Sequence, residues 1–227
     1  MSWITNFLTS SIGRKLIMSI TGLFLIQFLL VHLIGNLQLL VDDGGQQFNL
    51  YAKLMTSNPL IKTVSIVLYA SIVLHIVQGL LIWRQNYKSR NTRYAVNKHP
   101  DSDFSSRNMG WLGMIILIFL VLHLWQFWFQ MKFGVLDSMD YGEGSGPVKN
   151  LYIPVAYAFK QWYYVLFYII AMVFIALHLK HGFQSSFQTL GLNHKKYTPL
   201  IKGLGLIYAI LVPLGFAIIP IYFYFFL

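Results

Sequence analysis

The most regular feature of this 227-residue sequence is a series of five long apolar stretches separated by polar segments. Each one reaches or approaches the ~20 residues that an α-helix needs to cross the hydrocarbon core of a bilayer. They cover residues 16–40, 63–83, 109–130, 161–179 and 203–227. The pattern predicts an all-α membrane protein, a bundle of five transmembrane helices in which residues 1–227 form a single domain.

Residues 1–15 precede the first apolar stretch and do not have the pattern of a cleavable signal peptide, an apolar core followed by small residues. Apolar side chains recur here at helical spacing, at Trp3, Ile4, Phe7, Leu8 and Ile12. Such a pattern is typical of a helix that lies along the membrane interface. We therefore expect an interfacial segment before the first span.

The basic residues predict the orientation of the bundle. Twelve of the seventeen Lys and Arg lie before the first span, between the second and third, or between the fourth and fifth. Five of the seven acidic residues lie in the loops on the other side. Since short loops rich in Lys and Arg stay in the cytoplasm, we expect a cytoplasmic N-terminus in a multi-pass membrane protein. The net charge of +10 then reflects topology, and attraction to lipid head groups or an acidic partner, rather than nucleic-acid binding.

Two loops on the outer side have patterns of their own. Residues 48–55 are expected to form a short interfacial helix that ends before Asn58-Pro59. The loop 132–160 contains a glycine-rich stretch, residues 142–147, and then leads into the fourth span through residues 154–159. Either loop is a plain solvated connector or covers a site that opens on the outer side.

Four of the seven histidines lie inside the apolar stretches, one in each of the first four: His32, His75, His123 and His178. Ionisable side chains are costly in lipid and usually mark a functional site. With a rise of about 1.5 Å per residue, His32 and His123 fall in the outer half of the membrane, and His75 and His178 in the inner half. Depth alone therefore pairs His32 with His123 and His75 with His178.

A single histidine in a membrane helix either hydrogen-bonds a neighbouring carbonyl, lines a polar cavity or binds a metal. Four of them, one per helix and paired by depth, favour metal binding. Cysteine is absent, which excludes thioether-attached haem and an iron–sulfur cluster held by this chain. The spans also lack Asp and Glu, so zinc is the weaker candidate. The predicted cofactors are two non-covalent b-type haems, each between two histidines.

Residues near these histidines suit the same cofactor. Glycines lie in or at the ends of the four helices, where they either leave room for a flat macrocycle or allow close helix packing: Gly22, Gly35, Gly79, Gly113 and Gly182. Haem propionates near the inner surface should attract charge-assisted hydrogen bonds. The candidates for these contacts are Arg14, Lys15, Ser19, Arg107 and His181.

Over nearly its whole length the chain resembles the cytochrome b membrane-anchor subunit of succinate dehydrogenases and fumarate reductases, in its single-chain, five-helix, two-haem form. The resemblance rests on Ser19-x-Thr21-Gly22-Leu23-Phe24 leading to His32, Gly113 ten residues before His123, His75-x-x-x-Gly79, and His178-x-x-x-Gly182. It implies the same haem pairs as the depth argument. It also implies that this chain is a subunit of an enzyme whose dicarboxylate reaction takes place on a partner.

The resemblance implies two partners on the cytoplasmic face, a flavoprotein with FAD and an iron–sulfur subunit. Electrons would pass between them and a membrane quinone, with menaquinone the expected one, which reacts near the outer haem. A quinone reaction moves protons and needs a titratable group within reach. We expect the quinone site near Gln38, Asp42 and Asp43, with the two aspartates as the nearest titratable groups; the alternative is that both aspartates cap the end of the first helix and face solvent. Some relatives carry an acidic residue two positions before the fourth-span histidine, where this chain has Ala176.

Two other functions fit the same residues. One is the cytochrome b subunit of a hydrogenase or a formate dehydrogenase, whose partner docks on the outer face. The other, from a different class, is a polytopic transporter in which the histidines relay protons.

Overall fold

In a computed structural model of the protein, residues 3–88, 103–142, 144 and 146–227 are described. Within these ranges five helices are long and apolar enough to cross a membrane, which agrees with the number predicted from the apolar stretches. They cover Ser11–Leu40, Pro59–Lys88, Met109–Phe133, Trp162–Thr189 and Thr198–Phe226. The chain is therefore a helical, multi-pass membrane protein.

Some of these helices consist of several elements. The first joins α2 (Ser11–Asn36) to a 3-10 helix, η1 (Leu37–Leu40), and follows the short α1 (Trp3–Thr9). The third joins α6 (Met109–His123), a π-helix η2 (Leu124–Phe129) and α7 (Gln130–Phe133). The second, fourth and fifth are α4 (Pro59–Lys88), α9 (Trp162–Thr189) and α10 (Thr198–Phe226).

The connections carry short elements. They are α3 (Gln46–Ser57), α5 (Phe104–Arg107), the strands β1 (Ser138–Met139) and β2 (Val148–Lys149), and α8 (Tyr152–Phe159). The helix expected over residues 48–55 is confirmed as α3. The two strands pair antiparallel, with Ser138 opposite Lys149, and this hairpin has no counterpart in the sequence-based expectations.

The spanning helices extend beyond most of the predicted boundaries. The first begins at Ser11 rather than residue 16, because the Ser10 hydroxyl caps it by accepting a hydrogen bond from the Gly13 N–H at 3.0 Å. The fourth ends at Thr189 rather than residue 179. Apolar stretches mark the part of a helix that lies in hydrocarbon, whereas backbone hydrogen bonding continues into the polar interface until a cap ends it.

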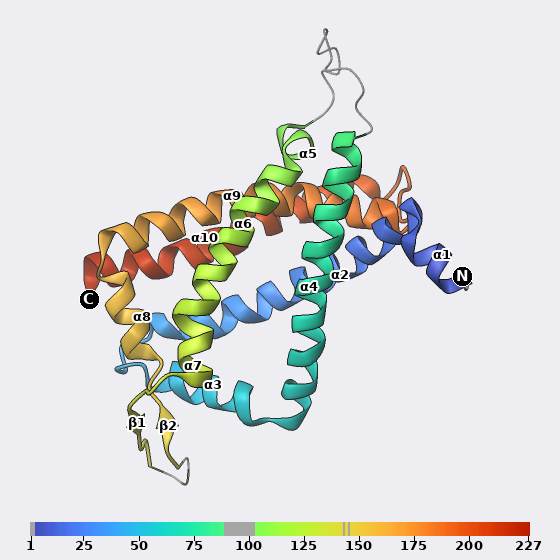
Figure 1. Cartoon of the computed structure of the whole chain (residues 1–227). Coiled ribbons are helices and arrows are strands. Elements are labelled where there is room, and N and C mark those ends of the chain that lie inside the picture. Colours follow the sequence, from blue (N-terminus) through green and yellow to red (C-terminus); the bar gives the residue numbers. More distant parts are fainter. Residues whose placement is uncertain (1–2, 89–102, 143, 145) are drawn as a thin grey trace.

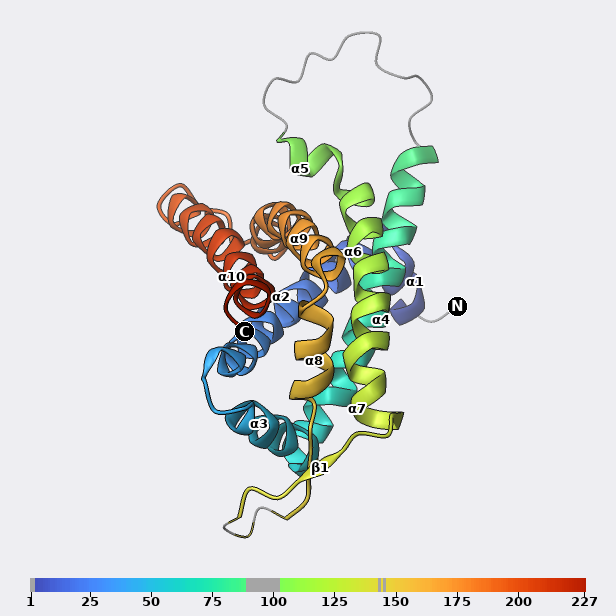
Figure 2. The same ribbon diagram turned by 90° about the vertical axis from the view of Figure 1, so that its left-hand side faces the viewer.

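The four helices that carry the histidines enclose a common interior. α2 packs against α4 and α9, α6 packs against α4 and α9, and α10 packs against α9 and α2. Figure 1 shows α9 and α10 side by side, with α4 and α6 crossing them. In the view turned by 90°, α10 lies on the far side of α9 from α6 (Figure 2). The fifth helix thus covers the bundle from outside.

The two ends of the bundle differ in character. At one end lie Lys15, Arg84, Lys88, Arg107 and Lys180; we call it the basic end. The opposite end, the hairpin end, carries α3, the β1–β2 hairpin and α8 (Figure 1). This second end is where the structure places the loops that the sequence predicts on the outer side.

Asn49, which is fully buried in α3, holds the hairpin end together. Its Nδ2 donates hydrogen bonds to the Tyr141 hydroxyl at 2.9 Å and to Asn150 Oδ1 at 3.0 Å. Its Oδ1 accepts from the backbone N–H groups of Leu151 at 3.0 Å and Tyr152 at 3.1 Å. Both the donor and the acceptor of one amide therefore tie α3 to the hairpin and to the start of α8.

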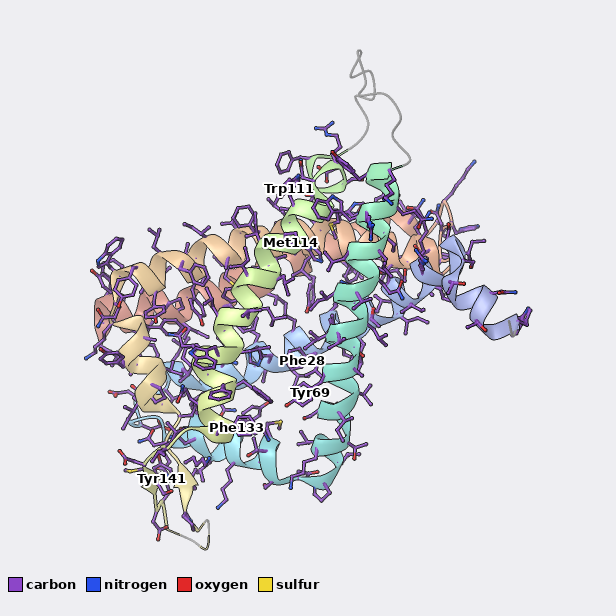
Figure 3. All side chains as sticks on the ribbon, viewed as in Figure 1. Phe28, Tyr69, Trp111, Met114, Phe133 and Tyr141 are labelled. Atoms are coloured by element: carbon purple, nitrogen blue, oxygen red, sulfur yellow. The ribbon has the colours of Figure 1, made fainter. Side chains whose placement is uncertain are left out.

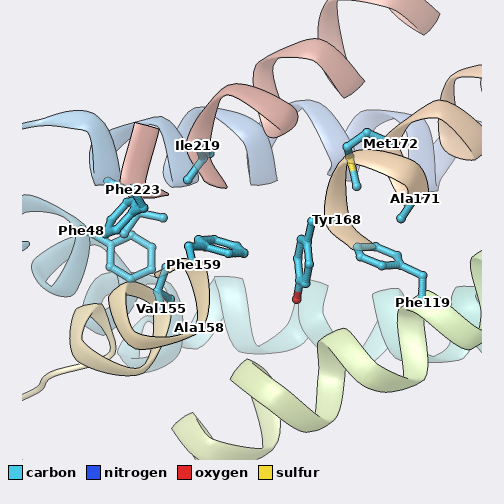
Figure 4. Close-up of a cluster of buried hydrophobic side chains, with 11 residues drawn as sticks. Phe48, Phe119, Val155, Ala158, Phe159, Tyr168, Ala171, Met172, Ile219 and Phe223 are labelled. Carbon is cyan, nitrogen blue, oxygen red and sulfur yellow. The ribbon is translucent and has the colours of Figure 1, made fainter. Parts of the chain in front are cut away.

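A cluster of buried apolar side chains joins residues of α3 and α8 to residues of α6, α9 and α10 (Figure 4). Its members are Leu39, Phe48, Phe119, Val155, Ala158, Phe159, Tyr168, Ala171, Met172, Ile219 and Phe223. Tyr168 stands out among them because its hydroxyl points toward α6 (Figure 4).

Candidate functional site

The four membrane-helix histidines meet as two pairs inside the bundle. The ring centroids of His32 and His123 lie 5.9 Å apart, with the ring planes at 88°. Those of His75 and His178 lie 6.3 Å apart, at 66°. The structure thus brings together the same partners that depth along the helices predicts.

The spacing within each pair suits one metal ion held between two imidazoles. A ring nitrogen binds a transition metal at about 2 Å, so two nitrogens on opposite sides of one ion lie about 4 Å apart, and the ring centroids roughly 6 Å apart. The observed 5.9 and 6.3 Å fall at this spacing. In the described ranges, no group of three or more His, Cys, Asp and Glu side chains lies close enough to hold a metal ion.

All four histidines line one cavity of about 1780 Å³ that runs through the bundle. A single drug-sized ligand occupies a pocket of roughly 300–1,000 Å³, so this cavity offers space for more than one large molecule. Its walls are mainly apolar side chains from α2, α4, α6 and α9. In volume and in its apolar lining, the cavity suits two flat, largely apolar macrocycles.

Two acceptors on α2, the Thr21 hydroxyl and the Met18 backbone carbonyl, hydrogen-bond the ring of His75. Thr21 Oγ1 donates its only proton to the Ile17 carbonyl at 2.7 Å. Its oxygen can therefore only accept from His75 Nδ1, 3.2 Å away, which places the ring proton on Nδ1. The lone pair of His75 then lies on Nε2, as a metal ligand requires. The other nitrogen, Nδ1, donates to an acceptor, which is the usual arrangement in ligating histidines.

The same arrangement recurs at His123 with a different hydroxyl. Tyr168 donates to Gln126 Oε1 at 3.1 Å and lies 3.3 Å from His123 Nδ1. The phenol oxygen accepts from Nδ1–H, so Nε2 of His123 carries the lone pair. One histidine of each pair is thus held in the metal-binding tautomer by a hydroxyl on another turn or helix.

The remaining two histidines are held less specifically. The Asn36 amide nitrogen lies 3.3 Å from Nδ1 and 3.5 Å from Nε2 of His32, so it favours neither nitrogen. His178 Nδ1 is buried and, among the described residues, has no hydrogen-bond partner. A buried polar atom without a partner costs about 1–3 kcal/mol of folding free energy. A group bound in the cavity beside His178 could supply the missing partner.

The structure separates the two roles that the sequence left open for the glycines. At Gly35 an added Cβ would come 2.3 Å from the Tyr51 ring, so this glycine permits close packing of α3 on α2. At Gly22 it would come 3.3 Å from His75 Cε1. At Gly113, which lines the cavity, it would meet nothing within 4 Å. Gly113 therefore faces open space, as expected where a macrocycle lies against a helix.

The predicted propionate contacts gather largely at the basic end of the cavity. Lys15, Ser19, Arg107 and His181 line it, whereas Arg14 does not. Arg14 instead donates to Gln85 Oε1 at 3.4 Å.

Next to this group, Lys180 Nζ lies 2.9 Å from Asp103 Oδ2 and ties the segment before α5 to α9. The hydrogen bond from Lys180 lowers the pKa of Asp103 below its ordinary value of 3.8. The Asp103 carboxylate therefore stays charged at the basic end of the bundle.

The predicted quinone residues lie elsewhere. Gln38, Asp42 and Asp43 follow α2 at the hairpin end, and none of the three lines the cavity. The Asp43 carboxylate accepts hydrogen bonds from the backbone N–H groups of Gly45 at 2.9 Å and Gln47 at 3.0 Å. Its geometry is that of a cap at the start of α3, whereas the sequence-based alternative was a cap at the end of the first span.

Sequence reasoning missed the hydroxyl partners of the histidines and a further aromatic pair, Tyr69 and Trp128. Thr21 lies in the motif of the first span, but nothing in that motif indicates a contact with His75. Tyr168 is 45 residues from His123, the histidine that it contacts. The available signal was a polar side chain inside an apolar stretch, which is too common to single out these positions. Comparison of the chain with protein-family models, curated proteins and solved structures found no match.

Proposed function

We propose that this protein is the di-haem cytochrome b subunit of a succinate:quinone oxidoreductase, the membrane anchor of a succinate dehydrogenase or fumarate reductase in a bacterial cytoplasmic membrane. One observation carries the proposal: four histidines line one cavity as two pairs. The ring centroids lie 5.9 Å apart in one pair and 6.3 Å apart in the other. The family resemblance of the sequence supplies the identity of the complex.

Each residue group has a defined task in this proposal. His32 and His123 hold one haem near the hairpin end, and His75 and His178 hold the other near the basic end. Thr21 fixes the ring of His75, as Tyr168 fixes that of His123. When bound, the two haems supply one-electron redox chemistry between the soluble partners and the quinone.

The basic end is the proposed docking side for the partners. In the orientation predicted from the sequence this end faces the cytoplasm, where the flavoprotein with FAD and the iron–sulfur subunit would bind. Lys15, Ser19, Arg107 and His181 line the cavity there and offer cationic and hydroxyl groups to the propionates of the haem held by His75 and His178. The quinone, with menaquinone the expected one, would react at the opposite end.

The decisive experiment is purification of the complex from native membranes, followed by a reduced-minus-oxidised optical spectrum and a count of haem per chain. We expect a b-type spectrum, two haems, and co-purifying flavoprotein and iron–sulfur subunits. Absence of any haem spectrum would favour the transporter with a histidine proton relay. Co-purification with a hydrogenase or formate dehydrogenase subunit would identify the other cytochrome.

Single histidine variants test the pairing in the same preparation. Replacing His32 or His123 with alanine should deplete one haem, and replacing His75 or His178 the other. Midpoint titrations distinguish the two haems. If His32→Ala and His75→Ala depleted the same haem, the assignment would be wrong.

A further inference from the structure

The cavity wall contains one more hydrogen-bonded pair, formed by Tyr69 of α4 and Trp128 of η2. Trp128 Nε1–H donates to the Tyr69 hydroxyl at 2.9 Å. The rings meet edge to face, with centroids 5.7 Å apart. Both residues line the cavity, and Figure 3 shows Tyr69 on the side of α4 that faces Phe28, in the space between α2, α4 and α6.

The π-helix η2 explains why Trp128 reaches this cavity. Trp128 follows His123 by five residues, and at 3.6 residues per turn a regular α-helix would place these side chains about 140° apart. A π-turn bonds residue i to i+5, so side chains five residues apart lie closer to the same face than in a regular α-helix. His123 and Trp128 therefore both face the cavity. Single π-turns inside helices occur frequently at functional sites.

The Tyr69 hydroxyl has a proton left to donate. Its oxygen accepts from Trp128, and no acceptor for its own O–H lies among the described residues. Tyr69 and Trp128 are 39% and 36% exposed although both line the cavity, so the pair lies at the border between the cavity and the outer surface of the bundle. In a membrane that outer surface faces lipid. A molecule that dissolves in lipid and carries a carbonyl oxygen could enter here and accept that proton in a hydrogen bond.

Two lysines complete the surroundings. Lys62 lies seven residues before Tyr69, two turns away on the same face of α4, and Lys132 lies four residues after Trp128. Both line the cavity at the hairpin end. Ammonium groups stabilise negative charge on a nearby oxygen, and that charge develops when a conjugated carbonyl compound takes up an electron.

We infer that Tyr69, Trp128, Lys62 and Lys132 form the binding site for the head group of the quinone, with the Tyr69 hydroxyl donating to one carbonyl oxygen. The tail of the quinone leaves between α4 and η2 into the lipid. This inference rests on the proposed function, which makes a quinone the substrate. It places the site beside the His32–His123 pair and away from Asp42 and Asp43.

The test compares Tyr69→Phe with wild type in the purified complex, using a short-chain naphthoquinone as the probe. We measure KM and kcat for succinate-dependent reduction of the probe, and its Kd by quenching of tryptophan fluorescence. Loss of one hydrogen bond should raise KM and Kd about threefold to tenfold. The haem spectrum should not change.

Tyr87→Phe is the matched control, since Tyr87 lies on the same helix and lines the same cavity at its basic end. It should leave KM and Kd unchanged. The inference is overturned if Tyr69→Phe changes neither constant, or if Tyr87→Phe raises them instead. It is also overturned if Tyr69→Phe lowers haem content while KM stays the same, since the hydroxyl would then serve the cofactor. A wild-type protein that lacks haem but binds the naphthoquinone through Tyr69 would overturn only the proposed function.

Discussion

Replacement of Tyr168 by phenylalanine should raise the midpoint potential of the haem held by His32 and His123. The variant keeps the ring, which is only 6% exposed, and removes the oxygen that accepts from His123 Nδ1–H at 3.3 Å. A ligating imidazole is a stronger N–H donor when its iron is oxidised, because the ferric ion carries more positive charge. The hydrogen bond therefore stabilises the oxidised state more, and its loss favours reduction.

The size of the shift follows from the geometry. A neutral hydrogen bond contributes about 0.5–1.5 kcal/mol, and a separation of 3.3 Å places this one toward the weaker side. If the oxidised state gains about 0.5–1 kcal/mol more from it, the potential rises by roughly 20–40 mV, since 59 mV corresponds to about 1.4 kcal/mol for one electron.

Redox titration of the purified complex, followed at the haem absorption bands, measures this shift. Thr21→Val is the counterpart at the other pair and should move the potential of the second haem only. Tyr164→Phe, one turn earlier in α9, is the control for the substitution itself. The reasoning is refuted if Tyr168→Phe moves both potentials equally, moves neither, or lowers the potential of the haem held by His32 and His123.

Three further outcomes are expected. Gly113→Leu should fill open space in the cavity and lower the haem-to-protein ratio, while circular dichroism shows the helices unchanged. A full haem content in this variant would contradict a macrocycle at Gly113. Asn49→Ala should destabilise the protein by about 1–3 kcal/mol, because the half-buried backbone N–H groups of Leu151 and Tyr152 lose their acceptor, and an unaltered thermal midpoint in detergent would count against this. The lowered pKa of Asp103 means that its pairing with Lys180 stabilises the fold at pH values above 3.8 and that this contribution disappears as the pH falls further. Asp103→Asn should remove this acid sensitivity of α5 in hydrogen exchange, by at most about 1 kcal/mol for so exposed a pair.

The number of spanning helices and the pairing of the histidines follow from the amino-acid sequence alone. Both depend on one coordinate, the distance along a helix axis, and this coordinate increases by a constant rise per residue. Apolar stretches therefore locate the spans, and the depths of His32, His75, His123 and His178 follow by counting. Neither the number of spans nor the pairing of the histidines depends on how the helices pack.

The side-chain contacts across the bundle, in contrast, could not be predicted without the three-dimensional packing of the helices. Such contacts depend on the rotation of each helix about its axis, and the π-turn in η2 alters that rotation for Trp128 without any clear sign in the sequence. The contact of Tyr168 with His123 spans 45 residues, and that of Trp128 with Tyr69 spans 59. Asp43 shows the converse, because its carboxylate is engaged by a local backbone cap and does not line the cavity, although the sequence made it a candidate for the quinone site.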